Sequence, residues 1–291
     1  MKMSPDFDPQ LEALISLLDE PDHGSFIKVR DQIFAYGSSA VPLLENAWEN
    51  TFDNSIQQRI EDIIHNIQYD QLFLDLTQWA HYGNSDLLEA YLIFTRYQFQ
   101  SIDQEAIRQQ IKQIHRDIWL ELNDNLTALE KVKVLNHIIY DLHGMQLPTR
   151  QVSEPRFLFL NNLLDSRTGY SFAIGVLYTL LAQSLNLPVY GVILPGERYV
   201  MAWLDASGSS PDEKARVMFY INPENRGGVF TRNEIAALLK KMKIPADEKI
   251  FRPVSARVIL DKFFELLSYL YSTNGENTRV REIDHLRSAL Q

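Results

Sequence analysis

Apolar residues recur at helical spacing throughout the first 120 residues. Three stripes show it most clearly: Leu11, Leu14, Ile15 and Leu18; Ile56, Ile60, Ile63, Ile64 and Ile67; and Ile107, Ile111, Ile114 and Ile118. Spacing of three and four places such residues on one face of a helix, and that face must be buried against a neighbour. The pattern predicts an all-helical segment from residue 11 to about 120.

A weak repeat lies within this segment. Tyr36-Gly37-Ser38-Ser39 and Tyr82-Gly83-Asn84-Ser85 are separated by roughly 46 residues, and each stands between two stretches with helical patterning. A period of roughly 40 to 47 residues with paired helices is typical of HEAT and armadillo units. We therefore expect a HEAT-like helical domain over residues 1–120, with an irregular helical domain as the alternative.

The patterning changes after residue 120. Val132, Leu135, Ile139 and Leu142 predict a helix that ends near Gly144. From Ser171 to Leu185 nearly every position is apolar, which is the signature of a helix buried on all sides.

Strand patterns follow this buried helix. Residues 189–194, 198–204 and 217–221 are rich in β-branched and aromatic residues. Pro195-Gly196 forms a turn between the first two, and the polar stretch 205–215 is a long loop before the third. Strands joined in this way predict an antiparallel meander.

Helices return after the strands. Thr231 and Glu234 have the spacing of a capping box and predict a helix from Arg232 to about Met242. Two apolar stripes, separated by a loop at residues 272–277, predict a pair of helices at the C-terminus. The organisation expected is therefore a helical domain over 1–120, an α+β domain over 121–250 and a helical hairpin over 251–291.

Composition narrows the range of functions. The 291 residues are 45% hydrophobic and 23% charged, which is typical of a folded globular protein. The net charge of −10 and the lack of a basic run argue against nucleic-acid binding. Cysteine is absent, which excludes disulfides and thiolate chemistry and fits a reducing compartment. No signal-peptide or membrane-spanning pattern is present, so we expect a cytoplasmic protein that does not enter a membrane.

Metal and phosphate sites are not indicated. Two pairs of a carboxylate and a histidine have the i, i+3 spacing that can present two ligands on one helix face: Asp62-x-x-His65 and Glu282-x-x-His285. A bundle metal site needs several such pairs to converge, and these two are more than 200 residues apart. Phosphate-binding glycine loops are also missing. We therefore expect neither a metal nor a cofactor.

The segment from Phe157 to Gly228 nevertheless has the order of a catalytic core. A loop enters the buried helix at Ser171, where a nucleophile would gain from the positive end of the helix dipole. Glu197 and Asn222 follow at the ends of strands, where a base and an orienting group would complete a triad.

This segment resembles the SirB-type transglutaminase-like proteins, the "regulator of SirC expression" family. The resemblance spans about residues 125–291. The residues that carry it are Phe159 to Gly169, Val176-Leu177-Tyr178, Leu187-Pro188-Val189, Leu194-Pro195-Gly196, Ile221-Asn222-Pro223, Gly227-Gly228 and Pro253-Val254-Ser255. It implies a papain/transglutaminase-like core, in which a buried helix packs on an antiparallel sheet, followed by a TPR-like C-terminal hairpin.

The resemblance also implies a Cys-His-Asp triad, and all three positions depart from it here. Ser171 stands at the cysteine position, Glu197 at the histidine position and Asn222 at the aspartate position. A serine is a weak nucleophile without a base, glutamate is a poor base at neutral pH, and asparagine does not stabilise a cation as a carboxylate does.

The leading hypothesis is therefore a non-catalytic protein that binds a protein or a small ligand through the degenerate groove or the flanking helices. Arg167, Tyr170, Tyr199 and Trp203 are the side chains expected to bind, although strand aromatics are more often packing residues. One alternative is a residual hydrolase or acyltransferase that uses Ser171 with Glu197 and Asn222. Another is a helical-repeat adaptor. The sequence leaves the partner and the oligomeric state unknown.

Overall fold

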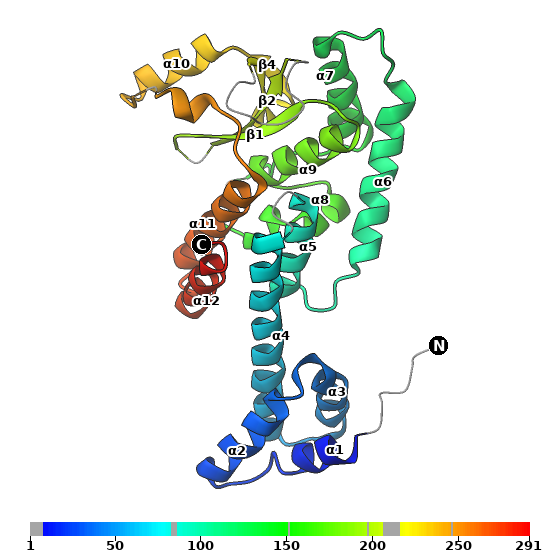
Figure 1. Cartoon of the computed structure of the whole chain (residues 1–291), viewed down its shortest axis with the longest axis vertical. Helices are drawn as coiled ribbons and strands as arrows, with labels where there is room; N and C mark the ends of the chain where they lie inside the picture. Colours follow the sequence, from blue (N-terminus) through cyan, green and yellow to red (C-terminus); the bar gives the residue numbers. More distant parts are fainter. Residues whose placement is uncertain (1–7, 83–85, 151, 197, 206–215, 246) are drawn as a thin grey trace. The chain divides into compact units, whose positions relative to one another are not determined.

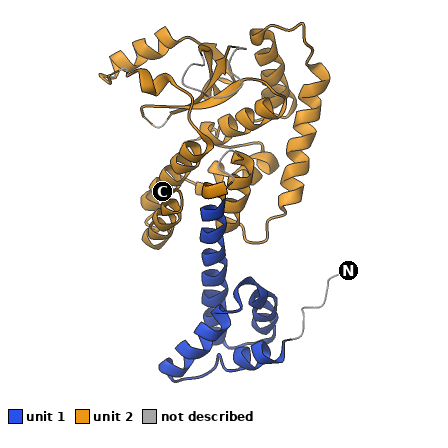
Figure 2. Cartoon of the chain, viewed as in Figure 1, with its two compact units in different colours: residues 1–78 blue, residues 79–291 orange. Residues whose placement is uncertain are grey.

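The computed structural model describes residues 8–82, 86–150, 152–196, 198–205, 216–245 and 247–291. It divides into two compact units, residues 1–78 and residues 79–291 (Figure 2). The first unit holds α1 (Pro9–Ser16), α2 (His23–Phe34), the 3-10 turn η1 (Gly37–Ala40), α3 (Val41–Asn50) and most of α4 (Asn54–Tyr82), and the division falls within α4.

The second unit contains the remaining elements (Figure 1). Its helices and turns are α5 (Leu87–Gln98), α6 (Gln104–Glu121), α7 (Ala128–Asn136), η2 (His137–Leu142), η3 (Pro155–Leu158), α8 (Leu160–Ser166), α9 (Ser171–Ser184), η4 (Pro223–Asn225), α10 (Arg232–Lys241), η5 (Glu248–Phe251), α11 (Ala256–Thr273) and α12 (Asn277–Ser288). Its strands are β1 (Val189–Leu194), β2 (Arg198–Leu204), β3 (Val217–Asn222) and β4 (Gly228–Phe230).

Aspartates begin four of the helices that precede the sheet. The carboxylates of Asp8, Asp22, Asp86 and Asp103 accept hydrogen bonds from amides in the first turns of α1, α2, α5 and α6. An aspartate at this position satisfies an amide that has no partner within the helix, and its charge also complements the helix dipole. Local sequence therefore fixes where these helices start.

The apolar stripes predicted before residue 120 are buried or half-buried. In the first unit, Ile60, Ile63 and Ile67 of α4 pack into one core cluster with Leu11 and Leu44. In α6, the predicted stripe of Ile107, Ile111, Ile114 and Ile118 is buried throughout its length. The first copy of the predicted repeat forms η1, whereas residues 83–85 of the second copy lie outside the described residues.

The division at residue 78 differs from the expected helical domain over 1–120, because α5 and α6 belong to the second unit. An aromatic cluster gives the reason. Phe94 of α5 packs against Phe159, Phe263 and Phe264, which come from the segment before α8 and from α11, at ring-centroid distances of 6.1, 5.1 and 4.6 Å. Buried aromatic pairs of this kind contribute more than their area alone.

The four strands form an antiparallel meander in the order β1-β2-β3-β4, as the strand pattern predicts. Helix α9 packs along β1 and β2. Another layer is formed by Ile235 and Leu239 of α10 and Phe251 of η5, which share a core with Val200 and Tyr220 of the sheet. The predicted loop at residues 206–215 lies outside the described residues. No helix in the described part of the chain is long and apolar enough to cross a membrane.

Candidate functional site

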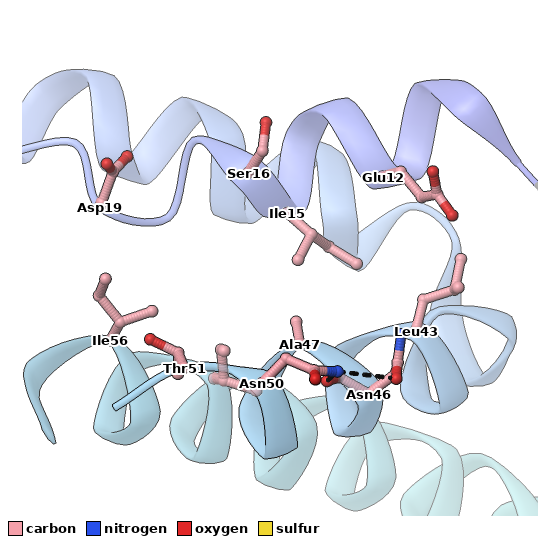
Figure 3. Close-up of a pocket in the computed structure, with 11 residues that line it drawn as sticks. Glu12, Ile15, Ser16, Asp19, Leu43, Asn46, Ala47, Asn50, Thr51 and Ile56 are labelled. Carbon is pink, nitrogen blue, oxygen red and sulfur yellow. Dashed lines mark hydrogen bonds between the residues drawn. The ribbon is translucent and has the colours of Figure 1, made fainter. Parts of the chain in front are cut away.

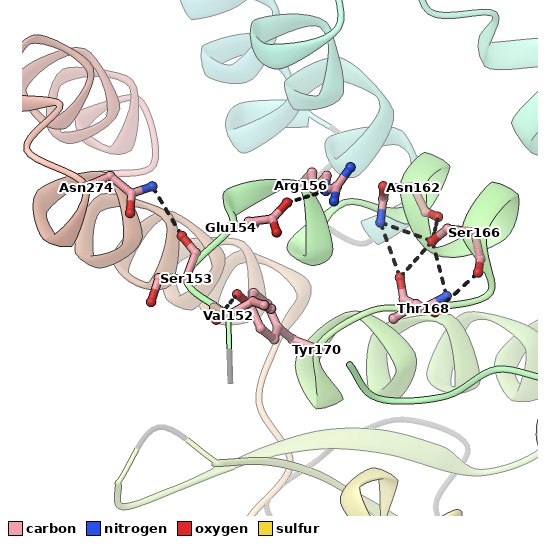
Figure 4. Close-up of polar contacts among 9 residues, drawn as sticks. All are labelled: Val152, Ser153, Glu154, Arg156, Asn162, Ser166, Thr168, Tyr170 and Asn274. Carbon is pink, nitrogen blue, oxygen red and sulfur yellow. Dashed lines mark hydrogen bonds and ion pairs between the residues drawn. The ribbon is translucent and has the colours of Figure 1, made fainter. Parts of the chain in front are cut away.

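The loop between α8 and α9 sets the position of Ser171. The Ser166 hydroxyl donates to the Asn162 carbonyl at 2.7 Å, and the Asn162 side-chain amide donates to the Thr168 carbonyl at 3.2 Å (Figure 4). Arg167 takes the left-handed conformation, with φ of 59°, and ends α8. A residue in this conformation stops a helix and turns the chain. Short-range hydrogen bonds within the loop thus fix the path of the chain up to the start of α9.

Tyr170 then anchors the first turn of α9. Its hydroxyl donates to the Val152 carbonyl at 2.7 Å (Figure 4). Its ring also packs edge-on against Phe157. Burial raises the pKa of the Tyr170 hydroxyl, so it stays a donor at neutral pH. The Asn274 amide at the end of α11 donates to the Ser153 carbonyl of the same segment. Tyr170, expected as a binding residue, is therefore engaged in holding elements together.

Ser171 is the first residue of α9 and is half-buried. No side chain caps this end of the helix, and the Ser171 hydroxyl has no hydrogen-bond partner among the described residues. The uncapped amides and the helix dipole favour negative charge at this end. They could stabilise an oxyanion, but they do not remove a proton from a serine hydroxyl.

Glu197 stands at the position expected for the base. Glu197 lies outside the described residues, between Gly196, which has φ of 79°, and Arg198, the first residue of β2. The sequence also offers no histidine to replace it, because none occurs between His143 and His285. The buried helix and all four strands therefore lack the side chain that most often serves as a general base.

Asn222 is the last residue of β3, and its side chain is used by the turn that follows. Its Oδ1 accepts the Glu224 amide at 2.9 Å, and its carbonyl accepts the Gly227 amide at 2.9 Å. An asparagine that bonds to the amide two residues ahead forms an Asx turn, a common way to start a tight turn. The turn itself contacts α9. Asn222 thus shapes the chain beside the buried helix.

The two remaining aromatic candidates are buried. Tyr199 is 2% exposed, and its hydroxyl shares a hydrogen bond of 3.0 Å with the Thr179 hydroxyl of α9. Its ring fills the space left by two glycines, since a Cβ at Gly175 or Gly191 would come within 2.5 Å of it. Trp203 is 5% exposed and stacks on Phe219. These contacts are packing contacts, and Arg167 is only half-buried in its loop.

A polar junction that the sequence did not indicate joins α9 to its neighbours through Asn136. The Asn136 side-chain amide donates to the Gly227 carbonyl at 2.9 Å, and its Oδ1 accepts the Tyr178 hydroxyl at 3.1 Å. It therefore joins α7, α9 and the β3–β4 turn. Only the close approach of Gly227, at φ of 75°, makes room for it. No local signal could have shown this, because the partners are far apart in sequence.

Two histidine–carboxylate pairs also lie in this unit. His143 Nε2 is 2.8 Å from Asp117 Oδ2, and His137 Nδ1 is 3.3 Å from Asp141 Oδ2. Asp141 also pairs with Arg226, and these hydrogen bonds hold the pKa of the Asp141 carboxyl below its usual value. Neither pair belongs to α9 or to the sheet. Across the described part of the chain, no group of three or more His, Asp or Glu could hold a metal ion.

Comparison with known proteins places this architecture in a family. Residues 105–265, from α6 into α11, match the Transglutaminase-like superfamily. The chain is also 28% identical over 100 residues to a UPF0162 protein of Pasteurella multocida, a stretch that covers 34% of this chain and 38% of that protein. No solved structure matches. Because the family match covers more than half of the chain, this protein belongs to the transglutaminase-like superfamily.

Proposed function

We propose that this chain is a non-catalytic transglutaminase-like protein that acts by binding a partner protein or a small ligand. The observation that carries the proposal is the state of the three triad positions. They hold serine, glutamate and asparagine, and the asparagine side chain is committed to its own turn. The loss of one triad member typically costs orders of magnitude in rate, and here all three positions differ.

The scaffold around these positions is retained. Helix α9 is buried against β1 and β2, and Tyr199 is wedged between the helix and the first strand. A chain that keeps the scaffold without the reacting groups is suited to recognition, since fold and chemistry are separable. We also propose the SirB-type assignment, with the α11–α12 pair as its TPR-like hairpin, a HEAT-like N-terminal segment and a cytoplasmic location.

The C-terminal hairpin has the rigidity that a recognition element needs. Arg287 makes a two-point contact with Asp261, with Nε–Oδ1 and Nη2–Oδ2 distances of 2.5 and 2.8 Å. The Arg257 side chain donates to the carbonyl oxygens of Leu290 and Gln291 at the end of the chain. Bidentate arginine contacts are geometrically specific, so α12 is held firmly on α11.

Turnover measurements test the non-catalytic assignment. The purified full chain is incubated with panels of acyl donors, peptides and esters, alongside the Ser171→Ala variant. We expect both proteins to give the same background rate. Turnover by the parent chain that Ser171→Ala abolishes would overturn the proposal and establish a serine-dependent hydrolase or acyltransferase instead. Ser184→Ala serves as the matched control, because Ser184 lies at the opposite end of α9 and its hydroxyl donates to the Leu181 carbonyl at 2.8 Å.

A further inference from the structure

The net negative charge of this protein comes from its first unit. Residues 1–78 contain 14 Asp and Glu against four Lys and Arg, whereas residues 79–291 contain 24 of each. The net charge of −10 therefore belongs wholly to the N-terminal helices. Two of the cations there are engaged locally: Arg30 pairs with Asp31, and Arg59 donates to the carbonyls of Leu18 and Glu20. An excess of one sign on a small surface attracts partners of the other sign.

A groove of about 380 Å³ opens in this unit between α1 and α3 (Figure 3). Ile15 of α1 and Ala47 of α3 face each other across it, and Ile56 of α4 lines one end. All three are half-buried and are continuous with the core through Leu43 and Ile60. The groove thus presents apolar surface that a partner could cover.

Two carboxylates stand at the edge of this groove. Glu12 of α1 and Asp19, which lies in the turn after α1, line it from one side; both are exposed, and they are seven residues apart in the sequence. No lysine or arginine is among the residues that line it. The apolar floor therefore has an acidic edge with no basic counterpart, a combination that favours an occupant with an apolar face and flanking cations.

The walls of the groove are fixed by hydrogen bonds. Trp48 Nε1 donates to Glu61 at 2.9 Å and holds α3 to α4, while the Gln57 side chain donates to the Thr51 carbonyl at 3.0 Å. Arg59 of α4 holds the end of the α1 segment through the Leu18 carbonyl. A preformed groove binds with a smaller loss of conformational entropy.

We propose that this groove binds a basic amphipathic helix of a partner protein. Apolar side chains of the helix pack on Ile15, Ala47 and Ile56, and two Lys or Arg residues about two turns apart pair with Glu12 and Asp19. Phe52, which is 96% exposed and follows Thr51 at the end of the groove, offers an aromatic anchor. This inference deepens the proposed binding function by giving it a site and a partner chemistry.

A peptide titration tests the inference with the full chain. The probe is a fluorescein-labelled amphipathic helix with leucines at i, i+3 and i+4 between two lysines seven residues apart, and a second peptide has glutamates in place of the lysines. Fluorescence anisotropy should show binding of the lysine peptide only, weakening as NaCl is raised from about 50 to about 300 mM. Glu12→Lys with Asp19→Lys should weaken binding at least about tenfold.

The matched control distinguishes the effect of the carboxylates at the groove from the effect of the net negative charge of the whole unit. Glu45 and Asp70 are exposed, belong to the same unit and do not line the groove, so Glu45→Lys with Asp70→Lys changes the charge equally elsewhere. We expect the control to lose no more than about threefold. Ala47→Trp should block the groove without a charge change, and circular dichroism checks that each variant is folded.

Three outcomes would overturn the inference. The first is an equal loss of peptide affinity in the groove variant Glu12→Lys with Asp19→Lys and in the control variant Glu45→Lys with Asp70→Lys. The others are undiminished binding by Ala47→Trp and equal binding of the lysine and glutamate peptides. Octylammonium that competes fully with the peptide at equal concentration would indicate a small-molecule site instead. The turnover measurements are independent of this test. Failure of peptide binding without turnover therefore rejects the groove alone, whereas serine-dependent turnover rejects the non-catalytic assignment alone.

Discussion

At the scale of single residues, Tyr199 shows how the contacts of a side chain follow from packing that the sequence does not display. A tyrosine beside a presumed catalytic turn suggests ligand binding, yet its hydroxyl is satisfied by Thr179 and its ring occupies the space above Gly175 and Gly191. Burial raises the pKa of the Tyr199 hydroxyl far above its usual range. The two glycines are needed because only a missing side chain lets the helix and the strand approach the ring this closely.

Gly191→Ala should destabilise the protein by about 1–3 kcal/mol, because the new Cβ would lie 2.3 Å from the Tyr199 hydroxyl oxygen. Adding Tyr199→Phe should recover part of the loss, since it removes the closest atom. Gly175→Ala is the contrast: its nearest contact is ring Cδ1, so Tyr199→Phe should not rescue it. Urea unfolding of the single and double variants measures the coupling, and equal rescue of both glycine variants would contradict this packing.

At the scale of elements, the helix around residue 140 shows where periodicity failed. Val132, Leu135 and Ile139 are buried as predicted, but Leu142 is 60% exposed. The cause is the π-helical turn η2, in which hydrogen bonds skip one further residue, as in the bond from the His143 amide to the Ile138 carbonyl. A π turn shifts the helical face, so Tyr140 is buried in place of Leu142.

The start of α9 should activate a thiol placed there. Ser171→Cys would be the only cysteine in the chain, and the helix dipole favours its thiolate. We expect the rate of iodoacetamide labelling to rise at lower pH than in the control Ser153→Cys, which places a thiol on an exposed residue outside any helix. A labelling midpoint above that of the control would mean that burial outweighs the dipole at this position.

The capping box of α7 should be detectable as a lowered pKa of Glu130 in a pH titration. The Glu130 carboxylate accepts from the amide and hydroxyl of Thr127 at 2.8 and 2.7 Å, and these bonds hold the pKa of Glu130 below its usual value. A lowered pKa stabilises the fold above the usual carboxyl pKa, and that stability is lost as the pH falls below about 4. Thr127→Ala should raise the pKa of Glu130 in an NMR titration, whereas Thr127→Ser should leave it unchanged. Identical titration curves for the two variants would contradict the hydrogen bond between the Thr127 hydroxyl and the Glu130 carboxylate.

At the scale of the whole molecule, the two units differ in net charge as well as in structure, since the sheet belongs to the second unit. The first carries the entire net charge, and the second, which contains the whole of the family match, is balanced. Mutual repulsion of like charges destabilises a compact state and is screened by salt. Overall composition hides this division, since a net charge of −10 says nothing about where the charge lies.

The stability of the first unit should therefore rise with salt. Between about 10 and about 500 mM NaCl the thermal midpoint should increase, because the Debye length shortens from about 30 to below about 5 Å. Glu45→Gln with Asp70→Asn should raise the low-salt midpoint and flatten the salt dependence in calorimetry. Glu121→Gln with Asp124→Asn removes two exposed acids from the balanced unit and should change neither quantity.

Helix starts, apolar faces and strand order are local properties, and the sequence alone predicts them well here. The capping box at Thr231 and Glu234, the α6 stripe and the antiparallel meander are all present as expected. Strand β4 was missed because it has only three residues, begins with the second of two glycines and depends on pairing with β3.

The sequence by itself also determined that no thiol nucleophile exists and that no histidine follows the buried helix until His285. Only the tertiary structure decided that Asn222 serves its turn, that Tyr199 and Trp203 are packing residues, and that α5 and α6 join the second unit. The physical reason is that caps and periodicity depend on neighbours along the chain, whereas burial, register and hydrogen-bond partners depend on residues brought together by folding.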